Sequence, residues 1–259
     1  SDLARDEEMF HILFENPAFR PDQMKIYPCI VNEYAELYSW WKQGKFHPYT
    51  DEENTKLLVA IKKLIPYYVR LNRLIRDIPG ESISAGNTIT NLREILQKEM
   101  DRQGVKCKCI RCREARHQTT DLEHAKLFID EYEAAGGREF FLNYASEDRS
   151  ILYAFVRLRL PDKKESAEHP IAEIRNSALI RELHTFGQLV PLEENKNAER
   201  KVQHEGFGKR LMREAERIAA ENGFEKMSVI AGVGVRGYYR MLGYELEGTY
   251  MNKGVGFRG

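Results

Sequence analysis

The chain has 259 residues, which allows one large domain or two smaller ones. Hydrophobic residues make up 42% and charged residues 31%, which excludes a disordered chain, and no apolar run approaches the roughly 20 residues of a membrane span. Because 40 Lys and Arg are matched by 40 Asp and Glu, net charge gives no argument for nucleic acid, and only local clusters can do so.

The first hundred residues predict alternating helices and strands. We expect helices over 1–16, 32–43, 50–64 and 91–103, and strands over 24–27 and 68–75. Thr50 and Glu53 have the spacing of a capping box, and Gly104 ends the last of these helices. The alternation favours a parallel sheet with crossover helices, and its few repeats suit part of a barrel or sheet that lacks its beginning.

The second half begins with a predicted helix over 121–135, which Gly136 and Gly137 end. Strands are expected at 139–145, 151–160 and 178–184, separated by a charged loop over 161–170. A long helix over 206–221 carries one apolar stripe and is closed by Gly223. A strand at 226–231, a short helix at 234–242 and a strand at 244–253 complete the pattern.

A glycine motif, Gln203 to Arg210, precedes the long helix. The start of a helix supplies free N–H groups and a positive dipole end, which together bind a pyrophosphate. Gly206 and Gly208 let the backbone approach phosphate oxygens, and Lys209 and Arg210 add positive charge in the first turn. The alternative is an ordinary helix start.

The order of elements around this motif resembles the core of GCN5-related acetyltransferases. The resemblance implies an α/β fold with a mixed, mostly antiparallel sheet flanked by helices, and acetyl-CoA as the cofactor. It places a strand edge for the pantetheine arm at Glu182, Leu183, His184 and Thr185. It places the pyrophosphate at Gln203, Gly206, Phe207, Gly208, Lys209 and Arg210.

The same resemblance implies a tyrosine that faces the thioester sulfur. We favour Tyr239 as the catalytic residue that also contacts coenzyme A, with Tyr238 second, because a nearby O–H can protonate a leaving thiolate. The alternative is that both tyrosines pack in the core. Four further residues are candidate bases, although a structural role is the preferred interpretation of each: Glu182, His184, His204 and Glu205.

A narrower resemblance covers nearly the whole chain. Segments 25–28, 76–79, 111–114, 181–184, 203–208, 232–240 and 242–244 are similar to the catalytic (third) subunit of Elongator. That family joins a radical S-adenosylmethionine barrel to an acetyltransferase domain. The resemblance implies carboxymethylation of the wobble uridine 34 of tRNA at C5, with acetyl-CoA as carbon donor, and acetyl-CoA hydrolysis stimulated by tRNA.

The resemblance also implies a division of the chain. Residues 1–104 would be the C-terminal part of the barrel, 105–120 a zinc-binding linker, and 121–259 the acetyltransferase domain. The family's [4Fe–4S] cluster and S-adenosylmethionine require a three-cysteine motif that is absent from the first hundred residues. We therefore expect a truncated chain that lacks the radical step.

Three cysteines, Cys107, Cys109 and Cys112, lie within six residues. Such clustering favours a metal and a reducing, cytoplasmic compartment rather than a disulfide scaffold, and no signal peptide is predicted. Zinc, which prefers four ligands, is the expected ion, with Cys29 or His117 as candidates for the fourth position. An iron–sulfur cluster and three free thiols are the alternatives.

The densest basic run surrounds these cysteines. Its members are Lys106, Lys108, Arg111, Arg113 and Arg116, and Arg70, Arg73 and Arg76 on the predicted strand at 68–75 add to it. Phosphates of tRNA would bind such a surface in a salt-dependent way. The alternative is that the arginines offset the negative charge of a thiolate zinc site.

Two other functions remain open. A protein lysine acetyltransferase would need a groove for a peptide beside Tyr239, and a scaffold that binds tRNA and acetyl-CoA would show no turnover. Expected partners are tRNA, acetyl-CoA and, further, other Elongator subunits or a second copy of the chain, but no membrane.

Overall fold

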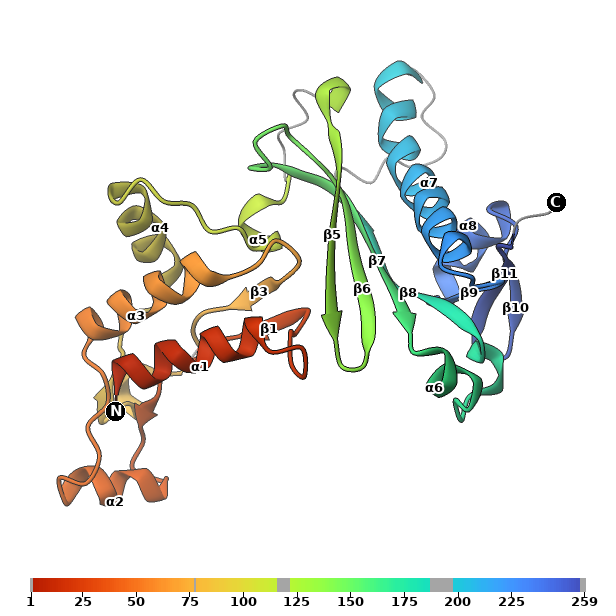
Figure 1. Ribbon diagram of the computed structural model, residues 1–259. Coiled ribbons are helices and arrows are strands. Elements are labelled where there is room, and N and C mark those ends of the chain that lie inside the picture. Colours follow the sequence, from red (N-terminus) through yellow and green to blue (C-terminus); the bar gives the residue numbers. More distant parts are fainter. Residues whose placement is uncertain (1, 77, 116–121, 187–197, 257–259) are drawn as a thin grey trace. The chain divides into compact units, whose positions relative to one another are not determined.

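The computed structural model describes residues 2–76, 78–115, 122–186 and 198–256, with only the backbone for 198–205 (Figure 1). The chain forms two compact units, Ser1–Cys112 and Arg113–Gly259. No helix of the described residues is long and apolar enough to cross a membrane.

The first unit consists of helices and two small strand pairs. Its helices are α1 (Leu3–Glu15), α2 (Glu36–Lys42), α3 (Asp51–Leu64), α4 (Leu92–Arg102) and, at its end, α5 (Ile110–Arg113), with a 3₁₀ turn η1 (Gly80–Ser82). Strand β1 (Gln23–Lys25) is parallel to β3 (Arg70–Arg73), and β2 (Ile30–Val31) is antiparallel to β4 (Ala85–Gly86). The predicted parallel pair with helical crossovers is confirmed for β1 and β3.

Local sequence accounts for the ends of α3 and α4. Thr50 and Glu53 form the predicted capping box, each side chain bonding the other residue's backbone N–H. Gly104 follows α4 with a φ of +67°, a conformation that glycine adopts without steric cost. The inward face of α3 buries Leu57, Leu58 and Ile61, so the helix is held by packing as well as by its cap.

The second unit is built on a seven-stranded sheet in the order β10-β11-β9-β8-β7-β6-β5. The strands are β5 (Lys126–Ala134), β6 (Gly137–Ala145), β7 (Leu152–Pro161), β8 (Ser177–Thr185), β9 (Lys226–Ile230), β10 (Glu245–Glu247) and β11 (Tyr250–Gly254). All neighbours are antiparallel except β8 and β9. The predicted mixed, mostly antiparallel sheet flanked by helices is confirmed.

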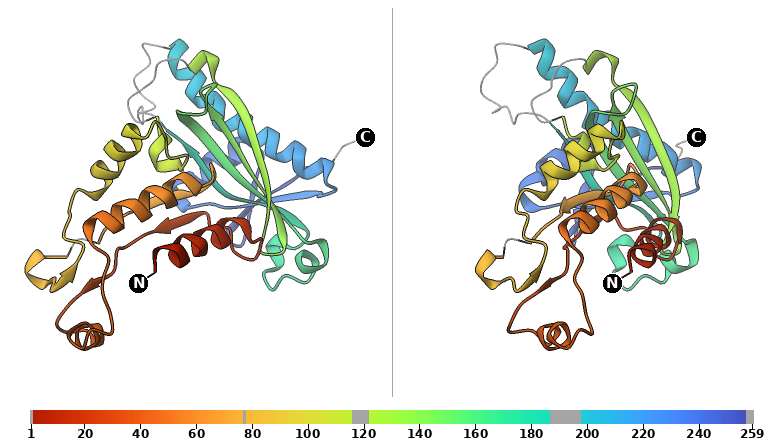
Figure 2. Two further views of the ribbon diagram at one scale, coloured as in Figure 1. Left: turned by 60° about the vertical axis from the view of Figure 1, so that its left-hand side comes forward. Right: turned by 90° about the vertical axis from the view of Figure 1, so that its left-hand side faces the viewer.

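Three α-helices and three 3₁₀ turns accompany the sheet among the described residues. They are η2 (Leu122–His124), α6 (Lys163–Ala167), η3 (Ala172–Ile174), α7 (Ala198–Glu221), η4 (Val233–Val235) and α8 (Arg236–Met241). Helix α7 lies across one face of the sheet (Figure 2). Its predicted apolar stripe is buried there, and the Phe207 ring stacks on Tyr144 with centroids 4.6 Å apart.

The prediction of a helix over 121–135 is wrong. Apart from the short turn η2, residues 126–134 form β5, the edge strand that pairs with β6 from Lys126 to Ala134. Phe128 and Tyr132 satisfy a helical spacing, but they also alternate with more exposed residues on a strand. A two-residue turn of Ala135 and Gly136, both with positive φ, joins β5 to β6 and makes the hairpin the favoured outcome.

Two further boundaries differ from the prediction. The long helix begins at Ala198, eight residues before the predicted start at Gly206. The predicted final strand over 244–253 is a hairpin of β10 and β11, because Gly248, with a φ of +58°, turns the chain between them.

Candidate active site and candidate metal centre

Strand β8 changes its pairing part-way along its length. Its first four residues, Ser177–Ile180, pair in parallel with β9, whereas its pairing with β7 continues to Thr185. A β-bulge at Arg181 marks the change, because Ile180 and Glu182 face the consecutive residues Leu158 and Arg157. Among the described residues, the edge of β8 from Arg181 to Thr185 therefore has a strand partner on one side only.

The side chain of the bulged Arg181 is fixed by a buried carboxylate. Glu139, only 3% exposed, accepts hydrogen bonds from Arg181 (Nη2 at 2.8 Å) and from Arg159 (Nη1 at 2.8 Å). One residue further on, the Glu182 carboxylate accepts a hydrogen bond of 2.9 Å from the buried Arg157 guanidinium. The side chain of Glu182 is thus committed to a partly buried ion pair, which argues against its role as a general base.

Helices α7 and α8 meet beside this part of β8. A Cβ at Gly208 of α7 would lie 2.8 Å from the Tyr238 hydroxyl and 3.8 Å from the Thr185 methyl group. Gly208 therefore admits the Tyr238 hydroxyl next to the helix backbone, which no other residue type allows without a shift. The three residues bring α7, α8 and the end of β8 to one point.

The two candidate tyrosines have different surroundings. Tyr239 is 6% exposed and packs edge-on against Tyr238 and Tyr244, whereas Tyr238 is half-buried. Burial raises the pKa of Tyr238, and burial followed by the neighbouring Tyr238 raises the pKa of Tyr239 to about 12. Both hydroxyls are therefore protonated at neutral pH and able to donate a proton.

Of the predicted pyrophosphate residues, Gly206 to Arg210 lie inside α7 rather than at its start. Their N–H groups are then committed to the helix, so in this conformation they do not point at a ligand. Phe207 is buried, Lys209 is exposed, and the Arg210 guanidinium lies 4.6 Å from the centre of the Tyr144 ring. The side chains of Gln203, His204 and Glu205 lie outside the described residues.

The side chains of the predicted pantetheine strand differ in exposure. Leu183 is half-buried, and His184 and Thr185 are exposed at the end of β8. The His184 ring contacts two phenylalanines, with its centroid 4.4 Å from Phe186 and 5.8 Å from Phe155, and these two rings also contact each other.

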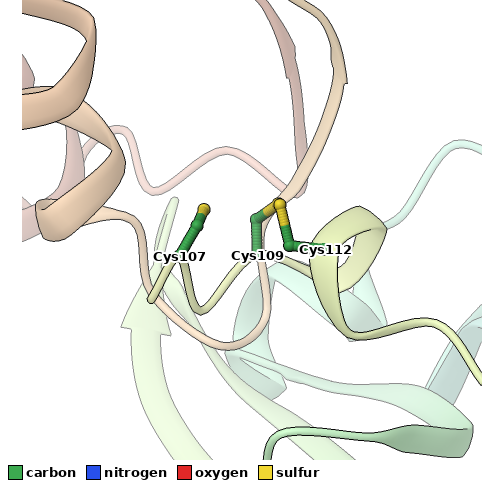
Figure 3. A group of neighbouring side chains, drawn as sticks. All are labelled: Cys107, Cys109 and Cys112. Atoms are coloured by element: carbon green, nitrogen blue, oxygen red, sulfur yellow. The ribbon is translucent and has the colours of Figure 1, made fainter. Parts of the chain in front are cut away.

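The cysteine cluster is assembled in the first unit. The Sγ atoms of Cys107, Cys109 and Cys112 all lie within 4.8 Å of one another, and Figure 3 shows the three side chains on the same side of their loop. Cys107 and Cys109 are buried. The group contains no fourth ligand from the described residues: Cys29 is exposed elsewhere, and His117 lies outside the described residues.

Hydrogen bonds between the thiols shift the pKa values of Cys107 and Cys109 in opposite directions. The pKa of Cys109 is lowered, first by hydrogen bonds from Cys107 and Cys112 and then by the backbone N–H groups of Cys112 and Leu71, which outweigh its burial. The pKa of Cys107 is raised, chiefly because it donates to Cys109. Three thiols this close together can bind a thiophilic divalent ion, which replaces their protons.

Comparison with known proteins extends the similarity to the whole chain. A family model described as the Radical_SAM C-terminal domain matches residues 21–102. The chain is 46% identical over 260 residues to tRNA uridine(34) acetyltransferase of Methanocaldococcus jannaschii, and 42% identical over 258 residues to Elongator complex protein 3 of Saccharomyces cerevisiae. Each match covers 98% of this chain, but 47% and 46% of the respective relative.

A solved structure gives the same result. The archaeal Methanocaldococcus infernus Elp3 with an N-terminal deletion matches with a TM-score of 0.85 at 42% identity, over 98% of this chain and 60% of that one. The chain is therefore similar to Elongator complex protein 3 over nearly its whole length. It spans about half the length of the curated relatives it matches.

The basic residues around the cysteines are not equally exposed. Lys106 and Lys108 are exposed, and the Lys108 ammonium lies 5.6 Å from the centre of the Tyr67 ring. Arg111 is half-buried and Arg113 is only 4% exposed, while Arg116 lies outside the described residues. In this structure, Arg113 does not present its side chain to an external phosphate.

Sequence reasoning missed two features of these sites. The bulge at Arg181 leaves no signal in a strand pattern, since Ala178–Thr185 reads as an ordinary strand. Lys62, the second feature, is a charged residue that is buried in the last turn of α3. A lysine inside an apolar helical stripe is the one signal that could have drawn attention to it.

Proposed function

We propose that this chain is the acetyl-CoA-using part of an enzyme that modifies the wobble uridine of tRNA. The reaction would add a carboxymethyl group at C5 of uridine 34 with acetyl-CoA as the carbon donor, and tRNA would stimulate acetyl-CoA hydrolysis. The observation that carries this proposal is the open edge of β8 beside Gly208 and Tyr238. The relatives named tRNA uridine(34) acetyltransferase support the substrate class.

In this proposal the chain has three parts. Residues 1–104 are the C-terminal part of a radical S-adenosylmethionine barrel, 105–120 are a zinc-binding linker, and 121–259 are a GCN5-related acetyltransferase domain. The match of residues 21–102 to the Radical_SAM C-terminal domain supports the first assignment. The splayed pair β8 and β9 in a mostly antiparallel sheet supports the third.

The backbone of Glu182–Thr185 would hold the pantetheine arm. An unpaired strand edge offers alternating N–H and C=O groups, and an extended chain with amide groups adds to it as a strand would. Acetyl-CoA, when bound, supplies an acetyl group that is activated as a thioester. Thr185, at the end of this edge, would together with Gly208 and Tyr238 be the part of the chain that faces the thioester.

The pyrophosphate would bind the backbone of the segment from Gln203 to Arg210, with Lys209 and Arg210 adding positive charge. Because α7 begins at Ala198, this requires residues 198–205 to leave the helix, so that a new helix start forms at Gly206. Hydrogen exchange of residues 198–210, with and without acetyl-CoA, tests this step. We expect weaker protection of 198–205 in the complex, and unchanged protection would remove the pyrophosphate from this segment.

The tyrosine hydroxyls would act as proton donors to the departing thiolate. Tyr238, rather than the initially favoured Tyr239, has its hydroxyl at the meeting point of α7, α8 and β8. Tyr239 would support it by packing against its ring, with the centroids 5.4 Å apart. A protonated phenol held beside a leaving sulfur lowers the barrier of thioester cleavage by general-acid catalysis.

The cysteine cluster would hold a structural zinc ion. The residues fit this ion because three thiols lie within 4.8 Å of one another. Thiolates are the preferred ligands of structural zinc, and the ion would tie the loop after α4 to β3, whose Leu71 N–H bonds Cys109. No iron–sulfur or S-adenosylmethionine ligand is assigned to this chain.

The exposed lysines next to this cluster would contribute to a tRNA-binding surface. Lys106, Lys108, Arg73 and Arg76 are exposed and are the basic residues that we assign to it. Arg111 and Arg113 are better suited to offset thiolate charge. Contacts with phosphates would weaken steeply as salt is added.

The test is acetyl-CoA hydrolysis by this chain with and without tRNA, at low and high salt. We expect tRNA to stimulate hydrolysis, and salt to abolish the stimulation. Acetyl-CoA binding without hydrolysis in any condition would favour the scaffold, and acetylation of a lysine peptide would favour the protein acetyltransferase. Absence of acetyl-CoA binding would overturn the proposal.

A further inference from the structure

The position of the Tyr238 hydroxyl depends on a very short helix. Helix α8 has 6 residues, no side-chain hydrogen bond caps its N-terminus, and Tyr239 is its buried residue. Isolated helices of this length are not stable in water, so contacts with the rest of the unit must hold α8 in place. A rotation of α8 about its axis would move the Tyr238 hydroxyl away from Gly208.

A Schellman motif ends α8 and ties it to Tyr244. The Tyr244 N–H bonds the Tyr239 carbonyl at 3.1 Å, and the Gly243 N–H bonds the carbonyl of Arg240 at 3.0 Å. Gly243 has the positive φ, +85°, that this motif favours. The rings of Tyr239 and Tyr244 then pack edge to face with centroids 5.9 Å apart. Contacts that fix Tyr244 therefore also fix α8.

Tyr244 is fixed by a carboxylate of α7. Its side chain is only 1% exposed, and its hydroxyl donates a hydrogen bond of 2.9 Å to Glu216 Oε1. Lys253 of β11 donates to both oxygens of the same carboxylate, at 2.9 and 2.8 Å. Its ammonium also lies 5.4 Å from the centre of the Tyr244 ring. Burial, followed by the Glu216 charge, raises the pKa of Tyr244, so the phenol stays a hydrogen-bond donor at neutral pH.

Helix α7 thus holds the region of α8 at two points (Figure 1). At Gly208 it admits the Tyr238 hydroxyl, and at Glu216, about 12 Å further along the helix axis, it binds the Tyr244 hydroxyl. One point of contact would leave α8 free to turn about it, whereas two points fix its direction as well. Small displacements of a reacting group can slow a reaction strongly, so the second contact matters for a proton donor.

We propose that Glu216, together with Tyr244 and Lys253, positions the Tyr238 hydroxyl for its role as proton donor. The inference rests on the proposed hydrolysis of acetyl-CoA and names further residues on which that reaction depends. A purely structural role makes a different prediction. In that case, loss of the Tyr244 hydroxyl would lower the melting temperature but leave the turnover of the folded protein unchanged.

The experiment compares wild type, Tyr244→Phe and the control Glu221→Gln, which removes an exposed ion pair of α7 with Arg217. The kcat and KM of acetyl-CoA hydrolysis are measured at a temperature at which circular dichroism shows each variant to be folded. We expect Tyr244→Phe to lower kcat about tenfold with little change in KM, because the proton donor is displaced while binding is kept. Glu221→Gln should match wild type.

Further measurements separate positioning from a general loss of stability. In the Tyr238→Phe background, which lacks the hydroxyl to be positioned, Tyr244→Phe should cause no further fall in kcat. Glu216→Gln, whose amide oxygen can still accept from Tyr244, should retain more activity than Tyr244→Phe. Amide hydrogen exchange over residues 236–241, which needs no activity, should be faster in Tyr244→Phe than in wild type.

Three results would overturn the inference while leaving the proposed function intact. The first is wild-type kcat in folded Tyr244→Phe. The second is an equal fall in kcat with and without the Tyr238 hydroxyl, which would assign Tyr244 to the general fold. The third is equal hydrogen exchange of α8 in Tyr244→Phe and wild type. If wild type does not hydrolyse acetyl-CoA, the proposed function itself fails and the positioning role fails with it.

Discussion

The cysteine cluster and the tyrosine site are assembled over very different distances along the chain. Cys107, Cys109 and Cys112 lie in one loop and the turn of α5 that follows, so their spacing alone brings the thiols within 4.8 Å. Thr185, Gly208 and Tyr238 come from β8, α7 and α8, and they meet only because the sheet and its helices place them together.

This difference determines what can disturb each site. The cluster depends on its own donor atoms and on charges buried around it, so single polar substitutions should act strongly. The tyrosine site depends on how closely two helices and one strand approach, so the removal of space at Gly208 matters as much as the loss of a hydroxyl. The predictions below separate these two kinds of dependence.

The largest effect is expected from Cys109→Ser. Cys109 is fully buried and accepts hydrogen bonds from both other thiols and from the Leu71 N–H, so its loss removes the central ligand. Because structural zinc contributes folding free energy directly, we expect loss of stoichiometric zinc and a lower melting temperature. Elemental analysis and thermal denaturation measure both. Cys29→Ser is the control, since Cys29 lies outside the cluster. Loss of zinc in this variant would identify Cys29 as the fourth ligand.

The next effect concerns the proton donor. Tyr238→Phe should lower the rate of acetyl-CoA hydrolysis about a hundredfold, within the range of general-acid catalysis, while coenzyme A binding changes little. Tyr239→Phe is the matched variant and should slow hydrolysis less, because the Tyr239 ring mainly supports Tyr238. Steady-state kinetics with a thiol reagent measures both. A larger loss in Tyr239→Phe would return the catalytic role to that residue.

The free energy of unfolding should depend on alkaline pH because the Tyr239 phenol is buried in the folded protein. The pKa of Tyr239 is about 12 in the folded protein and about 10 when unfolded, so the folded state holds the proton more tightly. Its contribution to stability is complete below pH 10 and is lost as the pH rises to 12, by about 2–3 kcal/mol in total. Urea unfolding across this range should show a steeper fall in wild type than in Tyr239→Phe. Parallel curves would mean that the phenol is accessible to water.

The smallest effect compares two glycines of α7. Gly206→Ala meets nothing within 4 Å and should stabilise the free protein by up to about 1 kcal/mol, since alanine favours a helix. Gly208→Ala gains the same propensity but forces the Tyr238 hydroxyl away, so its net stability should be lower than that of Gly206→Ala. Thermal denaturation without ligand decides this. Equal stabilisation by both would show that Tyr238 moves freely.

The sequence was most informative where local chemistry decides the structure. Thr50 and Glu53 determine the start of α3, Gly104 follows the end of α4, and the spacing of three cysteines predicts their cluster, because each depends on neighbours a few residues away. It failed over 121–135, where the pairing of β5 with β6 outweighed a helical pattern. Non-local pairing of this kind cannot be deduced from one segment.

The candidate site could be predicted in outline but not in detail. The order of strand, glycine motif and tyrosine pair pointed to β8, α7 and α8, and these three elements do meet. The choice between Tyr238 and Tyr239 depends on which ring faces Gly208, and that follows from how α8 packs on α7. The bulge at Arg181, which ends the pairing with β9, depends on the buried Glu139 that holds its side chain.

The open edge of β8 also bears on how this protein avoids self-association. An unpaired strand edge is a template on which another protein chain can add and aggregate. Along this stretch β8 carries Arg181, Glu182 and the exposed His184 and Thr185, and charged or polar side chains of this kind discourage the addition of an apolar strand. A slender polar ligand can still reach the backbone between them. The same residues that flank the proposed cofactor-binding edge would therefore protect the protein against aggregation when no cofactor is bound.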